Sequence, residues 1–279
     1  MKLTKALAKA KKSPKPNKHP RAIRPQPACN LTKDNKWKPP VYSESARVKL
    51  DPKTVYENRC VCIAPDAPEL DFYKVLRTKI QHLTCLKGLN TVMITSPQPG
   101  EGKTVTAVNL ALTFSMAYNQ TVLLVDCDLR RQNIHKVLGF ESNRNLIDYL
   151  VDERPLSELI VWPGIDKLTL ISGNRTIDSS AELLGSPRMQ NLMKELKSRY
   201  PDRYVLVDTA PLLVGADAVA LTPYVDCIVM VIEEGQTSMH SVQKAVDMIP
   251  REKFIGFVIN RQKISSVDKY SYNYYYRGV

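Results

Sequence analysis

The sequence has no apolar run long enough to cross a membrane. A transmembrane helix needs ~20 consecutive apolar residues, whereas the most apolar region, 204–232, is interrupted by three aspartates and two prolines. The N-terminus is cationic but no apolar segment follows it, so no signal peptide is predicted. We expect a cytoplasmic protein, with any membrane contact being peripheral, at the inner face of the cell membrane.

Cysteine is scarce and scattered. Six cysteines in 279 residues are too few for a disulfide framework. Cys60 and Cys62 are separated by one residue, without the second pair that a structural zinc site needs. We therefore predict reduced thiols and no zinc site.

Basic residues are concentrated at the N-terminus. Residues 1–40 carry ten Lys and two Arg against one acid, Asp34, which gives this segment +11 of the chain's net charge of +12. A basic segment is attracted to acidic lipid headgroups, nucleic acid or an acidic partner. Aromatic residues are not interleaved with the basic ones, which argues against nucleic acid. Peripheral membrane contact through residues 1–40 and a solvated, disordered basic arm stay open as alternatives.

Proline and tyrosine mark the two ends of the chain. Residues 1–68 hold ten of the nineteen prolines and are predicted to be a basic, Pro-rich arm and linker. Residues 69–264 are predicted to form the folded domain. Residues 265–279 form what we call the tyrosine tail, because they hold five of the thirteen tyrosines: Tyr270, Tyr272, Tyr274, Tyr275 and Tyr276.

Short β-branched runs alternate with helical patterns from Glu69 onward. Continuous apolar runs of this kind are typical of parallel strands covered on both faces. The alternation predicts an α/β fold with a doubly wound, mostly parallel sheet, in which ligands bind at the carboxyl ends of the strands. The predicted strands are Thr91–Thr95, Val122–Asp126, Leu168–Ile171, Tyr204–Asp208, Cys227–Ile232 and Phe254–Ile259, and the predicted helices are 103–118, 144–150, 187–199 and 238–248.

A glycine-containing loop joins the first of these strands to a helix. Its sequence, SPQPGEGKT at 96–104, matches G-x-x-x-x-G-K-[ST] except that Pro97 replaces the first glycine. Such a loop aims backbone N–H groups and a helix N-terminus at a phosphate. Lys103 would contact the β- and γ-phosphates, and the Thr104 hydroxyl suits Mg²⁺. The predicted nucleotide-binding residues are Pro99, Gly100, Glu101, Gly102, Lys103, Thr104 and Val105, with Asn260 as a candidate for contact with the base.

Aspartates end two further predicted strands. Asp126 and Asp128 follow the strand at 122–126, and Asp208 ends the strand at 204–208. Two carboxylates beside a phosphate would repel ATP unless a cation lies between them, so we predict Mg²⁺ held by one carboxylate, with the other free to accept a proton. Asp208 is a candidate for holding a metal-bound water. A single aspartate at such a place is otherwise a helix cap or a turn former.

Arginines come directly after these aspartates. Arg130 and Arg131 could neutralise transferred charge, or could form ordinary surface ion pairs. Both interpretations stay open.

The motifs form a recognisable set. GEGKT at 100–104, LLVDCDLRR at 123–131 with His135 after it, VLVDTAP at 205–211 and the tyrosine tail together resemble the cytoplasmic domain of the bacterial tyrosine kinases of capsule and exopolysaccharide synthesis. The resemblance implies a P-loop NTPase of the deviant-Walker (SIMIBI-like) type, with the three motifs as Walker A, A′ and B.

That resemblance assigns a role to each site residue. Lys103, Asp126, Asp128 and Arg130 would be catalytic, with Asp128 helping to activate the acceptor hydroxyl. Thr104, Asp126 and Asp208 would serve Mg²⁺ directly or through water, with ATP as the second cofactor. The tail tyrosines would be autophosphorylated in trans between subunits of a homo-oligomer.

The resemblance also implies partners. The family's ring-forming helix carries Glu-x-x-Arg-x-x-Arg, and this chain has Asp71, Lys74 and Arg77 at those positions, which keeps the charge but weakens bidentate pairing. No membrane-spanning adaptor segment is present, so the chain resembles the split form, whose partner is a separate membrane adaptor of the polysaccharide chain-length-determinant type.

Tyrosine phosphorylation imposes physical requirements. A phenol has a pKa of about 10, so a carboxylate and a metal-bound phosphate must meet it directly. Each phosphate would add about −1.5 to −2 charges, and repulsion could then expel the tail. Alternatively, the tyrosines pack on the sheet edge or form an adhesive tail.

Two other functions stay open. One is an ATP-driven dimerising switch like the cell-division and plasmid-partition ATPases, although Gln98 stands where those proteins carry an additional lysine. The other is a nucleotide-gated scaffold tethered by its basic arm and without kinase activity.

Overall fold

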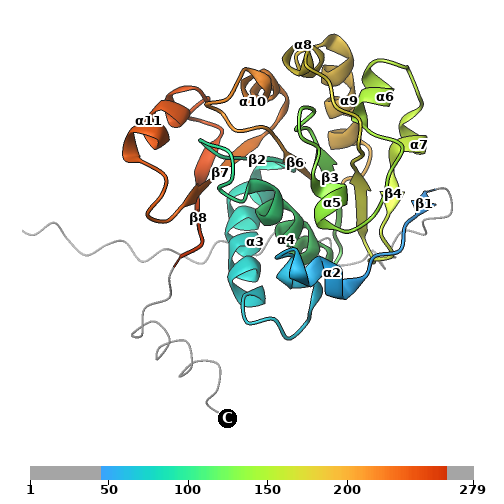
Figure 1. Cartoon of the computed structure of the whole chain (residues 1–279), viewed down its shortest axis with the longest axis horizontal. Helices are drawn as coiled ribbons and strands as arrows, with labels where there is room; N and C mark the ends of the chain where they lie inside the picture. The colour runs from blue at the N-terminus through green and yellow to red at the C-terminus, as the bar shows by residue number, and fades with distance from the viewer. Residues whose placement is uncertain (1–44, 263–279) are drawn as a thin grey trace, which may run out of the picture. The chain divides into compact units, whose positions relative to one another are not determined.

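A mostly parallel β-sheet of eight strands forms the centre of the structure, a computed structural model that describes residues 45–262 (Figure 1). The strand order is β1-β4-β5-β3-β6-β2-β7-β8, and within these residues the β4–β5 pair is antiparallel while the other pairs are parallel. The strands are β1 (Ala46–Arg47), β2 (Thr91–Thr95), β3 (Thr121–Asp126), β4 (Val161–Trp162), β5 (Leu168–Ile171), β6 (Arg203–Asp208), β7 (Cys227–Glu233) and β8 (Phe254–Asn260). The predicted doubly wound α/β fold is confirmed, and the six predicted strands are present.

Helices cover both faces of the sheet. One face packs against α2 (Pro52–Glu57), α3 (Leu70–Thr84), α4 (Lys103–Ser115) and α5 (Ile134–Val137). The other packs against α6 (Leu146–Leu150), α7 (Leu156–Leu159), α8 (Ser180–Leu184), α9 (Pro187–Ser198), α10 (Asp217–Leu221) and α11 (Met239–Asp247). Short 3₁₀ turns lie at Val61–Ile63, Cys85–Lys87 and Thr222–Tyr224.

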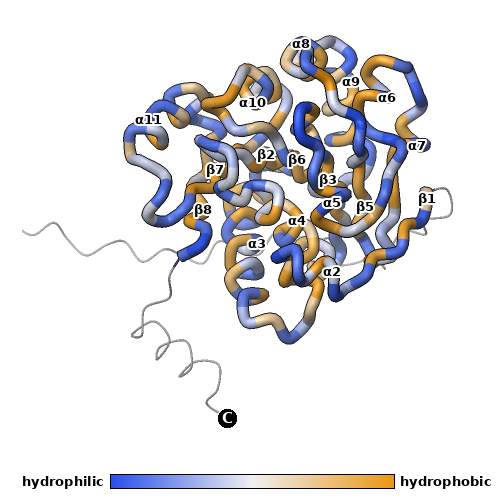
Figure 2. The backbone as a smooth tube through the Cα atoms, in the orientation of Figure 1, coloured by the Kyte–Doolittle hydropathy of each residue, from blue (hydrophilic) through white to orange (hydrophobic). Residues whose placement is uncertain are grey.

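Alternate residues of each central strand enter opposite cores. Val92 and Ile94 of β2 pack on the α4 face, whereas Met93 packs on the α9 face. Because successive side chains of a strand point to opposite faces, a strand buried on both faces must be apolar throughout. Figure 2 shows this as hydrophobic stretches along the strands and α4. The sequence runs continuously apolar in these strands for that reason.

The segment before α3 also belongs to the core. Residues 1–68 were predicted to be arm and linker, but the side chains of Val55, Cys60 and Cys62 are fully buried in the core cluster that also contains α4. Asn109 of α4 fixes the segment, since its Oδ1 accepts from the Cys62 N–H at 2.9 Å and its Nδ2 donates to the Arg59 carbonyl at 2.9 Å. The packed part of the chain therefore begins before the predicted boundary at residue 69.

Among the described cysteines, four are free thiols, as predicted: Cys60, Cys62, Cys127 and Cys227. Cys85 is disulfide-bonded, so the prediction of a reduced thiol there is wrong; the scattered cysteines gave no signal for it. None of the helices described between residues 45 and 262 is long and apolar enough to span a bilayer.

The carboxyl ends of β2, β3 and β6 lie side by side. In the register of the sheet Asp126 pairs with Asp208, and Asp208 pairs with Ile94, one residue before the end of β2. The loop after β2 and the two strand-terminal aspartates therefore meet at one edge, where a doubly wound sheet binds its ligands.

Candidate active site

The phosphate loop runs from Ser96 to Gly102, between β2 and α4. Gly100 and Gly102 adopt φ of 88° and 90°, a region that favours glycine. A Cβ on Gly100 would meet no atom within 4 Å, whereas one on Gly102 would lie 2.1 Å from Asn260 Nδ2. Glycine at position 100 is therefore favoured by its backbone conformation alone, whereas Gly102 also admits a close neighbour. Free N–H groups at the start of the 13-residue helix α4 suit a phosphate.

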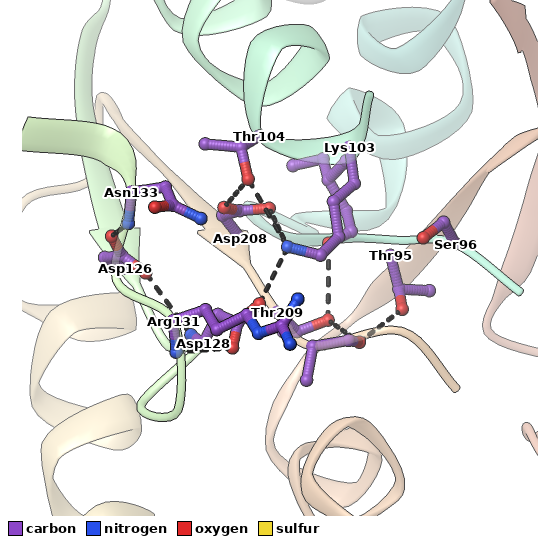
Figure 3. A network of polar contacts seen from close by, with 12 residues as sticks. Thr95, Ser96, Lys103, Thr104, Asp126, Asp128, Arg131, Asn133, Asp208 and Thr209 are labelled. Atoms are coloured by element: carbon purple, nitrogen blue, oxygen red, sulfur yellow. Dashed lines mark hydrogen bonds and ion pairs between the residues drawn. The ribbon is translucent and has the colours of Figure 1, made fainter. Parts of the chain in front are cut away.

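Lys103 and Thr104 bring this loop to the aspartates (Figure 3). Lys103 Nζ donates to Asp128 Oδ2 at 2.9 Å and lies 3.8 Å from Asp208 Oδ1. The Thr104 hydroxyl donates to Asp208 Oδ2 at 2.6 Å. The predicted Walker A and Walker B residues are thus in direct contact, and the A′ residue Asp128 reaches the same lysine.

Asp126 is held from the α5 side. Its Oδ2 accepts hydrogen bonds from the Asn133 N–H at 3.0 Å, the Ile134 N–H at 3.1 Å and the Ser172 hydroxyl at 3.0 Å. The side chain is fully buried. Burial, and then the nearby charge of Asp208, raise the pKa of Asp126 despite the hydrogen bond from Ile134.

The ionised form of Asp208 is also disfavoured by burial. Burial raises its pKa, although the Lys103 ammonium and the Thr104 hydroxyl favour the ionised form. Asp208 Oδ1 is buried without a hydrogen-bond partner. Lys103 itself has a raised pKa, because the charges of Asp208 and Asp128 outweigh its desolvation. The site therefore holds more buried negative charge than its own lysine balances.

This arrangement fits a magnesium ion. Asp208 accepts from the Thr104 hydroxyl and has a second oxygen without a hydrogen bond, and the buried Asp126 is its partner in the register of the sheet. Within residues 45–262 no group of three or more His, Cys, Asp or Glu side chains forms a metal cage. Mg²⁺ does not need one, since it takes one or two carboxylates and completes its octahedron with water and phosphate oxygens.

Arg130 lies away from this cluster. Its Nε is 3.2 Å from Asp217 Oδ2 and donates to the Ser180 hydroxyl at 2.9 Å. It therefore joins the loop after β3 to α8 and α10 through a buried aspartate, whereas the alternative was an ordinary surface ion pair. Its catalytic role stays a prediction. The backbone N–H of Arg131 instead holds Asp128 Oδ1 at 3.1 Å.

Asn260 contacts the phosphate loop. Its Nδ2 donates to the Glu101 carbonyl at 2.9 Å, and its Oδ1 accepts from the Arg261 N–H at 2.9 Å. Both ends of the side-chain amide are thus engaged by protein groups. Contact with the nucleotide base stays a prediction.

The three residues predicted for subunit contact lie on α3. Asp71 and Lys74 pair with each other at 3.0 Å, and Arg77 Nη1 donates to the Thr113 carbonyl of α4 at 2.6 Å. Arg77 is therefore used within its own subunit, and the role of the three in an oligomer stays a prediction. The tail tyrosines, Tyr270 to Tyr276, and the basic residues 1–40 lie outside the described residues.

Two residues of this site were not predicted. Ser172 directly follows β5 and hydrogen-bonds Asp126, so the rule that strand ends line the site could have found it. Its hydroxyl also lies 3.5 Å from His135 Nδ1, and His135 lines a cavity of about 410 Å³. Thr237 donates to Glu101 Oε1 at 2.5 Å from a loop 136 residues away, and nothing in the sequence marks it.

Comparison with known proteins identifies the family. A family model described as an AAA domain matches residues 89–255. Tyrosine-protein kinase YwqD of Bacillus subtilis is 31% identical over 75% of this chain and 87% of its own length. The chain belongs to the bacterial tyrosine kinases. Tyrosine-protein kinase CpsD of Streptococcus pneumoniae is 33% identical over 74% of this chain and 89% of its own length.

Longer relatives match the same part of this bacterial tyrosine kinase. The succinoglycan biosynthesis transport protein ExoP of Rhizobium meliloti is 29% identical over 75% of this chain but only 27% of its own length. Among solved structures, the kinase domain of the Escherichia coli tyrosine kinase ETK is 26% identical, with 70% of this chain and 78% of that chain covered and a TM-score of 0.61. The resemblance to this family stated from the motifs is confirmed.

Cell-division ATPases share the fold. The septum site-determining protein MinD of Pyrococcus horikoshii, solved with Mg-ADP, is 20% identical over 66% of this chain and 76% of its own, with a TM-score of 0.52. At that identity the likeness shows the fold alone. Membership of the bacterial tyrosine kinases makes this chain an ATP-binding protein-tyrosine kinase, as predicted. One of its relatives, ExoP, is named for succinoglycan biosynthesis.

Proposed function

We propose that this kinase transfers the γ-phosphate of ATP to its own tyrosine tail, in trans between copies of the chain, and thereby regulates exopolysaccharide or capsule synthesis or export. The observation that supports the proposal is the convergence of Lys103, Thr104, Asp128 and Asp208 at the mouth of the phosphate loop. The tyrosines at 270–276 follow shortly after Asn260, which contacts that loop.

Lys103 would change partners when ATP binds. In the structure its ammonium is paired with Asp128. Phosphates in the loop compete for the same ammonium, since a P-loop lysine contacts the β- and γ-phosphates. Once Lys103 turns to them, Asp128 Oδ2 loses its donor. A buried carboxylate without a donor is suited to accept a proton from an incoming hydroxyl.

Thr104, Asp208 and Asp126 would hold Mg²⁺, directly or through water. When bound, Mg²⁺ neutralises charge on the phosphates. The unpartnered Oδ1 of Asp208 and the raised pKa values of both carboxylates fit this role, because each reflects negative charge that lacks a balancing cation.

The transfer itself is a displacement at phosphorus. A tyrosine oxygen of the tail forms the new bond to the γ-phosphorus, the bond from that phosphorus to the bridging oxygen of ADP breaks, and the phenolic proton passes to Asp128. Backbone N–H groups at Gly100 and Gly102 would orient the phosphates and stabilise the charge that develops.

A complementation experiment tests the proposal. We would mix two full-length variants with ATP and Mg²⁺: Lys103→Ala, with an intact tail, and an active variant with all five tail tyrosines changed to Phe. Phosphate on tyrosines 270–276 of Lys103→Ala, mapped by mass spectrometry, is the expected result. ATP hydrolysis with no labelled tail tyrosine would support an ATPase switch and overturn the autokinase. Labelling of wild-type protein without labelling in the mixture would overturn transfer in trans.

The partner and membrane contacts are the second part of the proposal. We infer that a separate membrane adaptor of the chain-length-determinant type binds the kinase; the printed name of one relative, the succinoglycan biosynthesis transport protein ExoP, supports a place in a polysaccharide transport system. The excess charge of residues 1–40 supports peripheral contact with acidic lipid. Sedimentation of full-length protein and a 41–279 variant with vesicles containing phosphatidylserine tests this. Equal binding of the two would reject the contact.

A further inference from the structure

The middle of the phosphate loop is tied to distant parts of the chain. Glu101 is 4% exposed, and both of its carboxylate oxygens accept hydrogen bonds: Oε2 from the Gln98 N–H at 2.8 Å and Oε1 from the Thr237 hydroxyl at 2.5 Å. One bond closes the loop on itself. The other fixes it to the segment between β7 and α11.

Two more contacts come from the same side. Gln98 Nε2 donates to the Ser241 hydroxyl in the first turn of α11 at 3.0 Å. Asn260, the last residue of β8, donates to the Glu101 carbonyl at 2.9 Å. Two segments far from the loop in the sequence, one at 237–241 and one at Asn260, therefore converge on Gln98 and Glu101.

Thr237 is itself held in place. Its hydroxyl accepts from the Glu233 N–H at 2.8 Å while donating to Glu101, so its rotamer is set from both sides. The Glu233 carboxylate in turn pairs with Arg261 Nη1 at 2.6 Å. Glu233 at the end of β7, the end of β8 and the phosphate loop are therefore joined by hydrogen bonds and an ion pair into one unit.

These bonds matter because the loop has no regular structure of its own. A phosphate loop works when successive N–H groups point at one place. Between Ser96 and Gly102 no helix or strand fixes those groups, so side chains must do so. Glu101 is also an anion beside a phosphate site. Its two carboxylate oxygens are both engaged by donors, the Gln98 N–H and the Thr237 hydroxyl.

We propose that Thr237 and Asn260 are positioning residues for nucleotide binding: they clamp Glu101 and thereby orient the phosphate-binding N–H groups of the loop. This role rests on nucleotide binding by the kinase and not on autophosphorylation. The packing is closest at Gly102, where Asn260 Nδ2 occupies the space that a Cβ would need.

The direct test removes one hydroxyl. Thr237→Val keeps the shape of the side chain but leaves Glu101 Oε1 without its donor. Without that donor the N–H groups of the loop lose their fixed orientation toward the phosphates, so the Kd for ATP·Mg²⁺, measured by calorimetry on full-length protein, should rise about tenfold or more. Thr237→Ser, which restores the hydroxyl, should return the Kd to within about threefold of wild type. Thr176→Val, on an exposed loop, is the matched control.

A kinetic measurement separates positioning from general damage. With an exogenous tyrosine peptide as acceptor, Thr237→Val and Asn260→Ala should raise KM for ATP while retaining most of kcat. Wild-type ATP affinity in Thr237→Val would overturn the proposal. So would a loss that Thr237→Ser does not rescue, because a fold defect would then be responsible. Calorimetry measures ATP binding alone, so the Kd test of Thr237 holds whether or not the protein autophosphorylates.

Discussion

Lys103 Nζ lies 2.9 Å from Asp128 Oδ2 and 3.8 Å from Asp208 Oδ1, with all three side chains almost fully buried. The lysine that a P-loop uses for phosphate is thus the counter-ion of two acids in the structure. Lys103 therefore contributes to the stability of the fold as well as to the proposed reaction, and removing it leaves buried carboxylates without their cation.

Lys103→Ala should therefore lower stability as well as activity. Removing one partner of a buried ion pair costs about 3–5 kcal/mol, and we expect a loss near the lower figure because the acids can take up protons. Urea unfolding of nucleotide-free protein measures it. Lys79→Ala, at an exposed position on α3, is the control and should change little. Unchanged stability of Lys103→Ala would show that the pair contributes nothing to the fold.

Asp128→Asn tests the proposed proton acceptor. An asparagine keeps the size and can still accept a hydrogen bond from Lys103, but it cannot take a proton. General bases contribute about 10²–10⁴-fold, so kcat with a tyrosine peptide should fall at least about a hundredfold, with the Kd for ATP within a few-fold of wild type. Asp178→Asn, on an exposed loop, serves as the control. If kcat is retained, another group accepts the proton.

Asp226 should make stability depend on pH at the opposite edge of the sheet. Burial opposes its ionisation, but a hydrogen bond from Lys197 and others from the Asn90 and Thr91 N–H groups outweigh burial and hold the pKa of Asp226 below its usual value. A lowered carboxylate pKa stabilises the fold above the unfolded pKa of about 4, and that contribution is lost as pH falls through the folded pKa.

Asp226→Asn should accordingly lower the free energy of unfolding by about 2 kcal/mol at pH 7. The difference between wild type and variant should shrink as the pH is lowered below about 4. Urea titrations at several pH values measure it. A difference that stays constant across this range would contradict the assignment.

The sequence predicted the parts of the molecule whose residues carry local signals. The strands at 91–95 and 168–171 were located correctly because a strand buried on both faces is continuously apolar. The meeting of Lys103 with Asp208 followed from a general rule, that carboxyl ends of parallel strands share an edge. The two-residue strands β1 and β4 carry too few residues for any periodicity and were missed.

Contacts between distant segments were beyond such reasoning. Arg130 pairs with Asp217, 87 residues further along the chain, and nothing in its motif indicates that partner. Thr237 has no motif at all. Residues 1–68 were assigned to an arm and linker because of their prolines, but Val55 is buried in the core cluster that also contains α4. Side-chain partners of this kind depend on the packed fold and have no signature in one sequence.

Val55→Ala tests whether the segment before α3 belongs to the cooperative fold. The side chain is fully buried, and its truncation leaves a cavity, so we expect a loss of about 2 kcal/mol in unfolding free energy. Val214→Ala, where the side chain is 51% exposed, is the control. If Val55→Ala and Val214→Ala are equally stable, residues 52–68 are a linker and not part of the cooperative fold.

Ser172→Ala tests the support of the proposed magnesium site. Asp126 Oδ2 would keep the two backbone donors at Asn133 and Ile134 but lose the hydroxyl at 3.0 Å. Partners that orient a metal ligand typically change metal affinity by about 10–100-fold. The Mg²⁺ concentration that gives half-maximal kinase activity should therefore rise about tenfold, while saturating Mg²⁺ restores most of kcat. Ser172→Thr should keep the wild-type requirement, since it retains the hydroxyl. If Ser172→Ala leaves the Mg²⁺ requirement unchanged, Asp126 is not a magnesium ligand that this serine orients.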